Sequence, residues 1–357
     1  NEPLTWSTDP NATALPDSNS SVIVSHGVMV RGQFNISYVP HCYDLTVDST
    51  GYLNNYESAY TTGDLVVHNN LYNYGTIAPG YRMALTIKRD FYNYGAFLKR
   101  TSGYGNLNIF CYGNIINHGS FRAEAAGFTS SYYYGIHFKG NNPHHIQTFN
   151  DSTFYVSGIT VDDTLGYIIV DSLASISAFT TLNKSKIVLP TNTVYSNTLE
   201  LVGGQIVGGE IIANGNTIQT KSVTTLGDIR GDANNLIIKD AILEGYYRTG
   251  GANGYSTTSL VVFDGETVLN GTIENVFSNS TLYSDYHGIL IDGDFINNGS
   301  LQNNAGGDFL SINVLNSNFT NEGEIDAYGI KFYGSCEFST TDSISVNNFL
   351  ANDSNTT

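Results

Sequence analysis

The 357-residue chain has a formal net charge of −17, and only 13% of its residues are charged. The negative charge disfavours nucleic acid as a partner, because phosphates would be repelled. The sequence contains no apolar run of about eighteen residues, so no transmembrane segment is predicted. It also shows no long helical period. We therefore expect a nearly all-β chain with a polar surface of Asn, Ser, Thr, Gly and Tyr.

The N-terminal region, residues 1–46, starts with a polar stretch that holds three of the seven prolines. From residue 22 onward apolar residues alternate, as they do in strands. We interpret residues 1–46 as a polar tail and a cap, because an array of stacked strands must hide its first edge.

Residues 47–121 form the clearest repeat of the chain. The motif LVVHNNLYNYGTI starts at Leu65 and returns at Leu85 as LTIKRDFYNYGAF. Its alternating apolar residues predict two strands, and Asn-x-Gly between them predicts a corner. Because Asn and Gly tolerate left-handed backbone, we expect positive φ at the corner glycines. The corners of this block are Asn73 with Gly75, Asn93 with Gly95, and Asn117 with Gly119.

A strand, a corner and a second strand that recur about every twenty residues are typical of one solenoid coil. We predict a parallel β-solenoid, or β-helix, with coils of about 18–28 residues. A β-sandwich is the alternative, and the long offset between apolar anchors disfavours its tight hairpins. Interior columns are predicted for Leu65, Leu85 and Ile109, and for Ile77, Phe97 and Phe121.

The remaining chain follows the repeat less closely at first and then returns to it. We interpret residues 122–260 as a degenerate middle part of the solenoid with insertions; a separate β domain is the alternative. Residues 261–346 are a second repeat block, and residues 347–357 are a polar C-terminal tail. The corners of the second block are Asn297 with Gly299, and Asn321 with Gly323.

Tyrosine is over-represented, with 25 residues against a single tryptophan. Tyr72 and Tyr74 recur as Tyr92 and Tyr94, which predicts ladders of stacked rings on successive coils. Three consecutive tyrosines break the repeat and are candidates for an interface with another molecule: Tyr132, Tyr133 and Tyr134.

Three cysteines leave at least one thiol without a partner in the chain. Cys111 occupies an apolar anchor position, where a buried thiol is expected. Cys42 and Cys336 lie toward opposite ends of the chain, too far apart for one disulfide if coils stack in order. We expect at least one of them near a subunit boundary.

Candidate catalytic and metal-binding groups are few. Asp162 and Asp163, together with His287, weakly resemble fragments of polygalacturonase-type β-helix enzymes. No companion fragments of that family accompany them, so no catalytic residue is predicted.

Two other groups contain residue types that bind metals. His137, His144 and His145 are interpreted as polar loop residues rather than zinc ligands, because no further ligand accompanies them. Asp292 and Asp294 resemble half of a calcium loop. No cofactor is predicted, although the acidic composition permits calcium.

The corner Asn-x-Gly-[Ser/Thr/Ala] followed by an apolar residue, within 45–121 and 261–346, resembles repeats of filamentous-haemagglutinin-like adhesins. The acidic composition, rich in Asn, Gly and Tyr, is similar to that of archaeal sheath and surface-layer proteins. Both resemblances imply an extracellular location at the cell surface or envelope, a structural role and no catalysis.

We accordingly expect a structural protein that assembles with other copies of itself into a sheath, layer or fibre. Strand edges and tyrosine-rich contacts would join the copies, and residues 1–21 or 347–357 would lie on an adjacent copy. An adhesin or carbohydrate-binding rod, with surface glycans as partners, is the alternative. A polysaccharide-degrading β-helix enzyme is a third reading.

Overall fold

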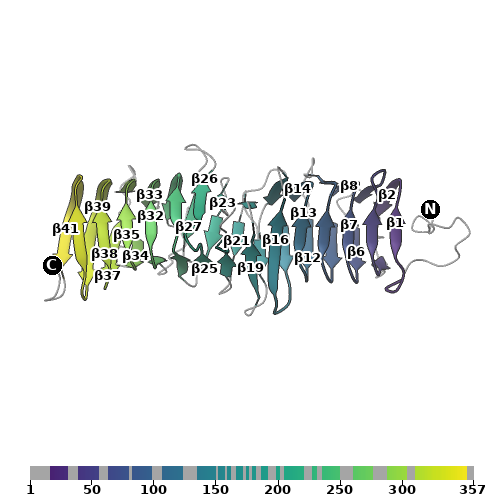
Figure 1. Ribbon diagram of the computed structural model, residues 1–357, viewed down its shortest axis with the longest axis horizontal. Coiled ribbons are helices and arrows are strands. Elements are labelled where there is room, and N and C mark those ends of the chain that lie inside the picture. The colour runs from purple at the N-terminus through teal and green to yellow at the C-terminus, as the bar shows by residue number, and fades with distance from the viewer. Residues whose placement is uncertain are drawn as a thin grey trace, which may run out of the picture. The chain divides into compact units, whose positions relative to one another are not determined.

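A computed structural model describes the chain in segments, and every structural statement below concerns these residues. They are 17–30, 39–55, 63–79, 83–98, 107–123, 135–149, 152–156, 159–161, 166–171, 174–176, 179–181, 186–191, 198–201, 205–220, 227–230, 235–249, 260–275, 288–303 and 310–351. Within them every regular element is a β-strand and none is a helix (Figure 1). The predicted all-β class is confirmed.

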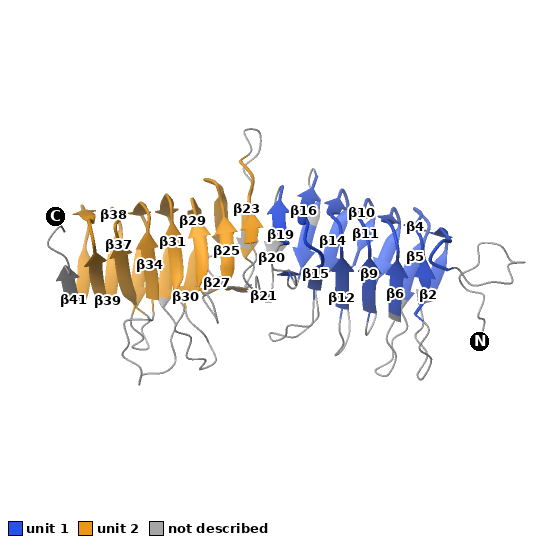
Figure 2. Cartoon of the chain, turned by 90° about the horizontal axis from the view of Figure 1, so that it is seen from below, with its two compact units in different colours: residues 1–179 blue, residues 180–357 orange. Residues whose placement is uncertain are grey.

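The chain separates into two compact units, residues 1–179 and 180–357 (Figure 2). In each unit successive strands take turns among three rows. Except at the C-terminal end, each strand pairs in parallel with the strand three places later. This is the predicted parallel β-solenoid. The boundary between the units lies inside the region 122–260, whose described strands follow the same pattern.

Unit 1 builds its three rows from short strands. The first row is β1 (Val22–Val24), β4 (Leu45–Val47), β7 (Leu71–Asn73), β10 (Phe91–Asn93), β13 (Ile115–Asn117), β16 (Pro143–Thr148) and β19 (Tyr167–Val170). The second row is β2 (Gly27–Val30), β5 (Tyr52–Asn55), β8 (Thr76–Ala78), β11 (Ala96–Phe97), β14 (Ser120–Ala123), β17 (Thr153–Val156) and β20 (Ala174–Ile176). The third row is β3 (His41–Cys42), β6 (Gly63–Val67), β9 (Met83–Ile87), β12 (Leu107–Cys111), β15 (Gly135–Phe138) and β18 (Ile159–Val161). Strand β21 (Phe179–Thr181) lies at the unit boundary.

Unit 2 repeats this arrangement. Its first row is β22 (Lys186–Val188), β25 (Gly209–Ile212), β28 (Leu236–Lys239), β31 (Val261–Asp264), β34 (Gly288–Asp292) and β37 (Ser311–Leu315). Its second row is β23 (Thr198–Leu201), β26 (Thr217–Thr220), β29 (Ile242–Glu244), β32 (Thr267–Leu269), β35 (Phe295–Asn297), β38 (Asn318–Asn321) and β40 (Glu337–Thr340). Its third row is β24 (Gln205–Val207), β27 (Gly227–Arg230), β30 (Tyr246–Thr249), β33 (Thr272–Asn275) and β36 (Ser300–Asn303). The long strand β39 (Glu324–Tyr333) pairs with β36 and β37, and β41 (Ile344–Ala351) pairs with β39.

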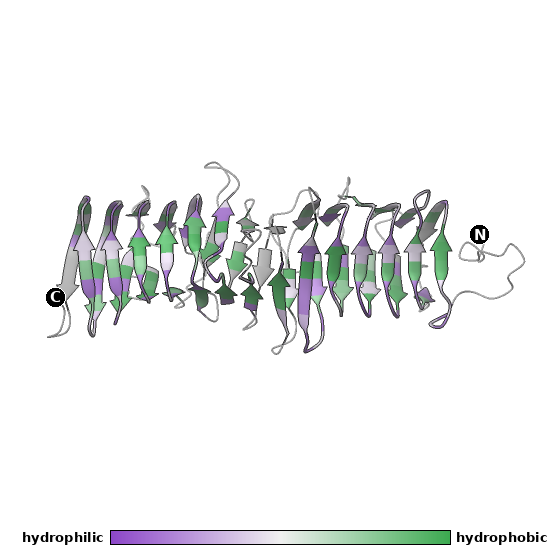
Figure 3. Cartoon of the chain, in the orientation of Figure 1, coloured by the Kyte–Doolittle hydropathy of each residue, from purple (hydrophilic) through white to green (hydrophobic). Residues whose placement is uncertain are grey.

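The core consists of columns of apolar side chains, one from each coil. Because side chains of a strand alternate between its two sides, every second residue points into the solenoid. Hydrophobic and hydrophilic residues accordingly interleave along the strands (Figure 3). Both predicted columns are confirmed, with every member in register and buried: Leu65, Leu85 and Ile109, and Ile77, Phe97 and Phe121.

The coils vary more in length than the sequence predicts. Val314 pairs with Phe332, 18 positions further on, whereas Phe121 pairs with Phe154, 33 positions further on. The predicted upper limit of about 28 residues is therefore wrong for this coil. Its extra residues fall between β14 and β17, where the sequence already indicates an insertion.

At the N-terminal end, the strands expected from residue 22 onward belong to the solenoid itself, because β1 pairs in register with β4. At the other end β41 continues to Ala351 in register with β39. Residues 347–351, predicted as tail, are thus strand. Residues 1–16 and 352–357 lie outside the described part of the chain.

Candidate functional site

The corner glycines allow neighbouring coils to approach closely. A Cβ on Gly95 would lie 2.1 Å from the backbone oxygen of Gly75, and one on Gly119 would lie 2.0 Å from that of Gly95. The same clash would arise at Gly75, Gly299 and Gly323. None of these five glycines has φ in the left-handed region, so the predicted positive φ is wrong. Contact between coils, and not local backbone shape, requires glycine here.

The corner asparagines form a buried ladder inside unit 1. The amide nitrogen Nδ2 of Asn73 donates to Oδ1 of Asn93 (2.7 Å), and Nδ2 of Asn93 donates to Oδ1 of Asn117 (2.8 Å). All three side chains are fully buried. Their amides therefore satisfy one another across coils. In the same column, Val47 pairs with Asn73 and Thr148 pairs with Asn117. The asparagine ladder therefore spans three coils, between the apolar Val47 and Thr148.

Unit 2 contains a shorter ladder of the same kind. Nδ2 of Asn297 donates to Oδ1 of Asn321 (2.7 Å), and Nδ2 of Asn321 donates to the Thr340 hydroxyl (3.1 Å). Leu269 precedes this ladder in the column. The predicted corner residues thus meet one another in stacks, and their role is to hold coils together.

All three cysteines are free and buried. Burial, with a smaller contribution from Asp44, raises the pKa of the Cys42 thiol to about 12. Burial likewise raises the pKa of the Cys111 thiol to about 12. Neutral, enclosed thiols react slowly. The sulfurs of Cys42 and Cys336 cannot touch another copy while the coils are intact; a position near a subunit boundary stays a prediction.

A ladder of rings runs along the outside of unit 1. Tyr74 stacks on Tyr94 with centroids 5.0 Å apart, Tyr94 on His118 at 4.9 Å, and His118 on Phe149 at 4.3 Å. A second stack joins Tyr72 and Tyr92 at 5.0 Å. The predicted tyrosine ladders are confirmed.

This stacking limits what the outer ladder can bind. Tyr74, Tyr94 and Phe149 are each about 40–48% exposed. However, the faces of the inner rings are covered by neighbouring rings, which leaves mainly edges and hydroxyl groups open. Sugars bind aromatic residues through the ring faces, so the ladder is a poor sugar platform. Tyr132, Tyr133 and Tyr134 lie outside the described residues.

A second, polar ladder precedes the first-row strands of unit 1. Oδ1 of Asp44 accepts the backbone N–H of Asn70, and Oδ1 of Asn70 accepts that of Asp90 (both 3.1 Å). Oδ1 of Asp90 then accepts the N–H of Asn114 (2.7 Å), and Oδ1 of Asn114 accepts that of His145 (2.9 Å). Each side chain thereby satisfies a backbone donor one coil away. Sequence reasoning missed this ladder, although an Asp or Asn before each strand marks it.

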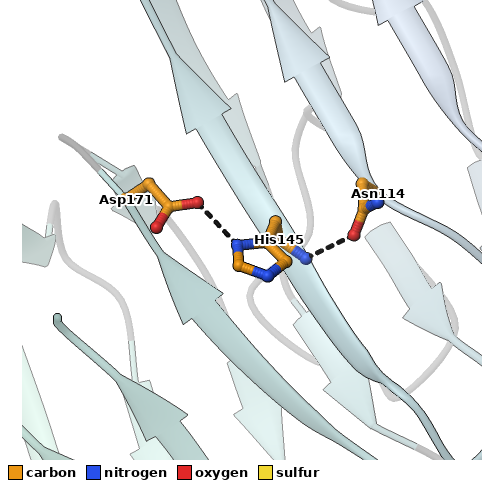
Figure 4. Close-up of polar contacts among 3 residues, drawn as sticks. All are labelled: Asn114, His145 and Asp171. Atoms are coloured by element: carbon orange, nitrogen blue, oxygen red, sulfur yellow. Dashed lines mark hydrogen bonds and ion pairs between the residues drawn. The ribbon is translucent and has the colours of Figure 1, made fainter.

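The polar ladder ends in a hydrogen bond between the side chains of His145 and Asp171 (Figure 4). Nδ1 of His145 lies 2.8 Å from Oδ2 of Asp171, and the two side chains are 37% and 26% exposed. A carboxylate that orients an imidazole is part of many hydrolytic sites, but such sites also need a nucleophile or metal. Among the described residues, the side chain of His145 has a hydrogen bond to Asp171 and none to a nucleophile. The pair joins two coils.

The other candidate ligands do not converge. His137 Nε2 contacts Oδ1 of Asn108 (3.1 Å), whereas Nδ1 of the fully buried His144 contacts the backbone oxygen of Gly113 (2.9 Å). Among the described residues no group of three or more His, Cys, Asp or Glu side chains is placed to hold a metal ion. Asp162, Asp163 and His287 lie outside the described residues.

Unit 2 contains an ion-pair network that joins three neighbouring strands. Lys239 bridges two carboxylates, with Nζ 2.9 Å from Glu210 and 3.0 Å from Asp264. These two hydrogen bonds raise the pKa of Lys239 above its usual range, and the bond to Glu210 has the larger effect. One coil further on, Asp292 is exposed in register with Asp264, and no lysine among the described residues pairs with it.

Comparison with known proteins adds no relative. No family model matches this chain. No curated protein and no solved structure matches it either. The described residues contain no helix of the length and hydrophobicity needed to span a bilayer. The class of protein defined here is therefore the parallel β-solenoid itself.

Proposed function

We propose that this chain is a structural protein that assembles with copies of itself into an extracellular sheath, layer or fibre at the cell surface. The proposal includes no catalysis and no cofactor. The observation that carries it is the strand edge at each end of the described solenoid, with which no described strand pairs.

At the C-terminal end the core columns come to the surface. Phe319, Ile325 and Ala327 are buried in the penultimate coil, whereas their partners one coil later, Phe338, Ile344 and Val346, are only half-buried. Among the described strands, β40 pairs only with β38 and β41 only with β39. The last coil thus presents backbone donors and acceptors together with apolar side chains, as an added strand requires.

At the N-terminal end the described strands also leave one edge unmatched. Strand β1 pairs only with β4, β2 only with β5 and β3 only with β6 among these strands. Both ends present parallel strands, so the first coil of one copy can continue the last coil of another. Such a head-to-tail contact is heterologous and produces open polymers when it does not close into a ring.

The carbohydrate-binding alternative has less support. Its main feature is the exposed ring ladder from Tyr74 to Phe149, and the rings of that ladder cover one another's faces. The acidic, Asn- and Tyr-rich composition fits an exported surface protein in either case.

Phe338→Lys tests the proposal. A lysine at this half-buried edge position should prevent another coil from adding while the last coil remains folded. We expect polymers of the wild-type protein in electron microscopy and single molecules of Phe338→Lys. The matched control is Ser339→Lys, whose exposed side chain lies next to Phe338 on the same strand and should leave polymers intact. A wild-type protein that stays monomeric in sedimentation at high concentration, with and without calcium, would overturn the proposal.

A further inference from the structure

Charge is segregated along the solenoid. Residues 82–149 contain seven Lys and Arg but only Asp90 and Glu124, a net charge of +5 in a chain of −17. Residues 250–351 contain twelve Asp and Glu but only Lys331, a net charge of −11. Because coils stack in chain order within each unit, this asymmetry in sequence becomes an asymmetry between groups of coils.

Two lysines of unit 1, Lys88 and Lys139, lie at one corner together with His68 and Tyr112, and we name these four residues the basic corner. Each directly follows a third-row strand, and its backbone N–H bonds to the previous coil at 2.8–2.9 Å. Nζ of Lys88 lies 3.8 Å from the centroid of the Tyr112 ring. Lys88 and Tyr112 are exposed and His68 and Lys139 are half-buried, so the ammonium groups are held in place by rings and remain accessible.

The acidic residues of unit 2 also gather at one corner, the acidic corner: Asp264, Glu266, Asp292 and Asp294. Asp264 and Asp292 end β31 and β34 in register, and Glu266 and Asp294 directly precede β32 and β35. Glu266, Asp292 and Asp294 are exposed. Only Asp264 has a lysine partner among these four, in the described residues.

The geometry points to a contact between the basic corner of one copy and the acidic corner of another, side by side in the assembly. This inference rests on the proposed function and adds a lateral contact to the end-to-end one. Both corners are ladders with the strand spacing of about 4.8 Å, so their charges can face each other over several coils. Lys88 and Lys139 are two rungs apart, about 10 Å along the stack.

A second copy fits the basic corner better than an anionic polysaccharide does. The chain itself supplies carboxylates on adjacent rungs, Asp264 and Asp292, in a ladder with the same strand spacing as the basic corner. A polyanion would in addition meet the repulsion of a molecule with net charge −17 along all its acidic coils. In the proposed contact between copies, each acidic corner instead faces a basic corner.

Charge reversal tests the contact on preassembled polymers. Lys88→Glu/Lys139→Glu makes the basic corner acidic, and Glu266→Lys/Asp292→Lys makes the acidic corner basic. Each variant alone should form single filaments that fail to pair side by side, with about tenfold or greater loss of pairing, since like charges then face each other. A mixture of the two variants should pair again.

Three controls make the outcome decisive. Arg122→Glu/Lys186→Glu changes the net charge equally, outside both corners, and should leave pairing intact. Pairing should weaken from 0.1 to 1 M salt, as the screening length falls from about 10 to 3 Å. Sulfated dextran, added to the monomeric Phe338→Lys variant with and without the Lys88→Glu/Lys139→Glu changes, reports polyanion binding at the basic corner.

The possible results separate the two proposals. Filaments that pair despite either reversal, or a mixture that does not pair, overturn the lateral contact and leave end-to-end assembly standing. Tight dextran binding at Lys88 and Lys139, without side-by-side pairing of filaments, overturns the contact in favour of a polyanionic ligand. A wild-type protein that forms no filaments overturns both proposals.

Discussion

At the residue scale, the corner glycines show how a solenoid selects amino acids through contacts between coils. Gly95 is glycine because the oxygen of Gly75 occupies the space of a side chain, and the same relation recurs in the next coil at Gly119. Gly27, by contrast, has ordinary φ and nothing within 4 Å of an added Cβ. Gly27 therefore has room for a side chain, whereas Gly95 does not.

Gly95→Ala should destabilise unit 1, because an added Cβ 2.1 Å from a backbone oxygen forces the coils apart. We expect a loss of about 1–3 kcal/mol or more in the free energy of unfolding, measured by urea denaturation. Gly27→Ala is the matched control and should be neutral. Equal effects of the two substitutions would show that backbone flexibility, and not coil contact, matters at Gly95.

At the scale of the elements, the asparagine ladder ties strands β7, β10 and β13 together beyond their backbone pairing. Asn93, the middle rung, accepts a hydrogen bond from Asn73 and donates to Asn117 and to the backbone oxygen of Ser120. Asn73, the first rung, has an Oδ1 without a hydrogen-bond partner among the described residues. Its neighbour in the previous coil, Val47, offers no donor side chain.

Asn93→Ala should therefore cost more than Asn73→Ala. The first removes partners on both sides. The Asn73 amide nitrogen then keeps its bond to the Ala96 oxygen and the Asn117 Oδ1 keeps the Gly119 N–H, but each loses its rung-to-rung bond inside the core, at about 1–3 kcal/mol in total. The second breaks one rung-to-rung bond, to the Oδ1 of Asn93, and removes an acceptor that is already unpaired. Urea denaturation of the two variants, with identical volume changes, measures the difference. Equal losses would mean that the ladder acts through packing alone.

At the scale of the whole molecule, the solenoid has an interaction pattern that is short-range along its length. Each coil pairs with the coils before and after it, so stability is close to a sum of local terms. The rings of Phe91 and Phe121 lie 5.4 Å apart, and those of Phe91 and Phe97 lie 6.0 Å apart. Phe91 is fully buried within unit 1.

Phe91→Ala should destabilise unit 1 by about 3–5 kcal/mol, because it leaves a cavity among these rings. Hydrogen exchange should accelerate in β7, β10 and β13, while β34 and β37 of unit 2 keep their protection. Ile116→Ala, on the outward side of β13, is the control and should change little. Equal acceleration throughout both units would contradict local stability.

The sequence by itself determined the strands, the parallel solenoid and the interior columns. These follow from alternation within a strand and from recurrence about every twenty residues, and both are properties of short stretches of chain. Tyr74 and Tyr94 could likewise be assigned to one stack, since they hold the same place in the repeat.

Only the tertiary structure decided why the corner residues are what they are. Local preference predicts left-handed backbone at Asn-x-Gly, yet Gly95 is needed for the approach of Gly75, and Asn93 lies inside a ladder. The charged corners and the 33-residue coil from Phe121 to Phe154 could not be predicted from the sequence either. Each depends on the backbone one coil away, and loops of variable length conceal from the sequence which residues that coil brings into contact.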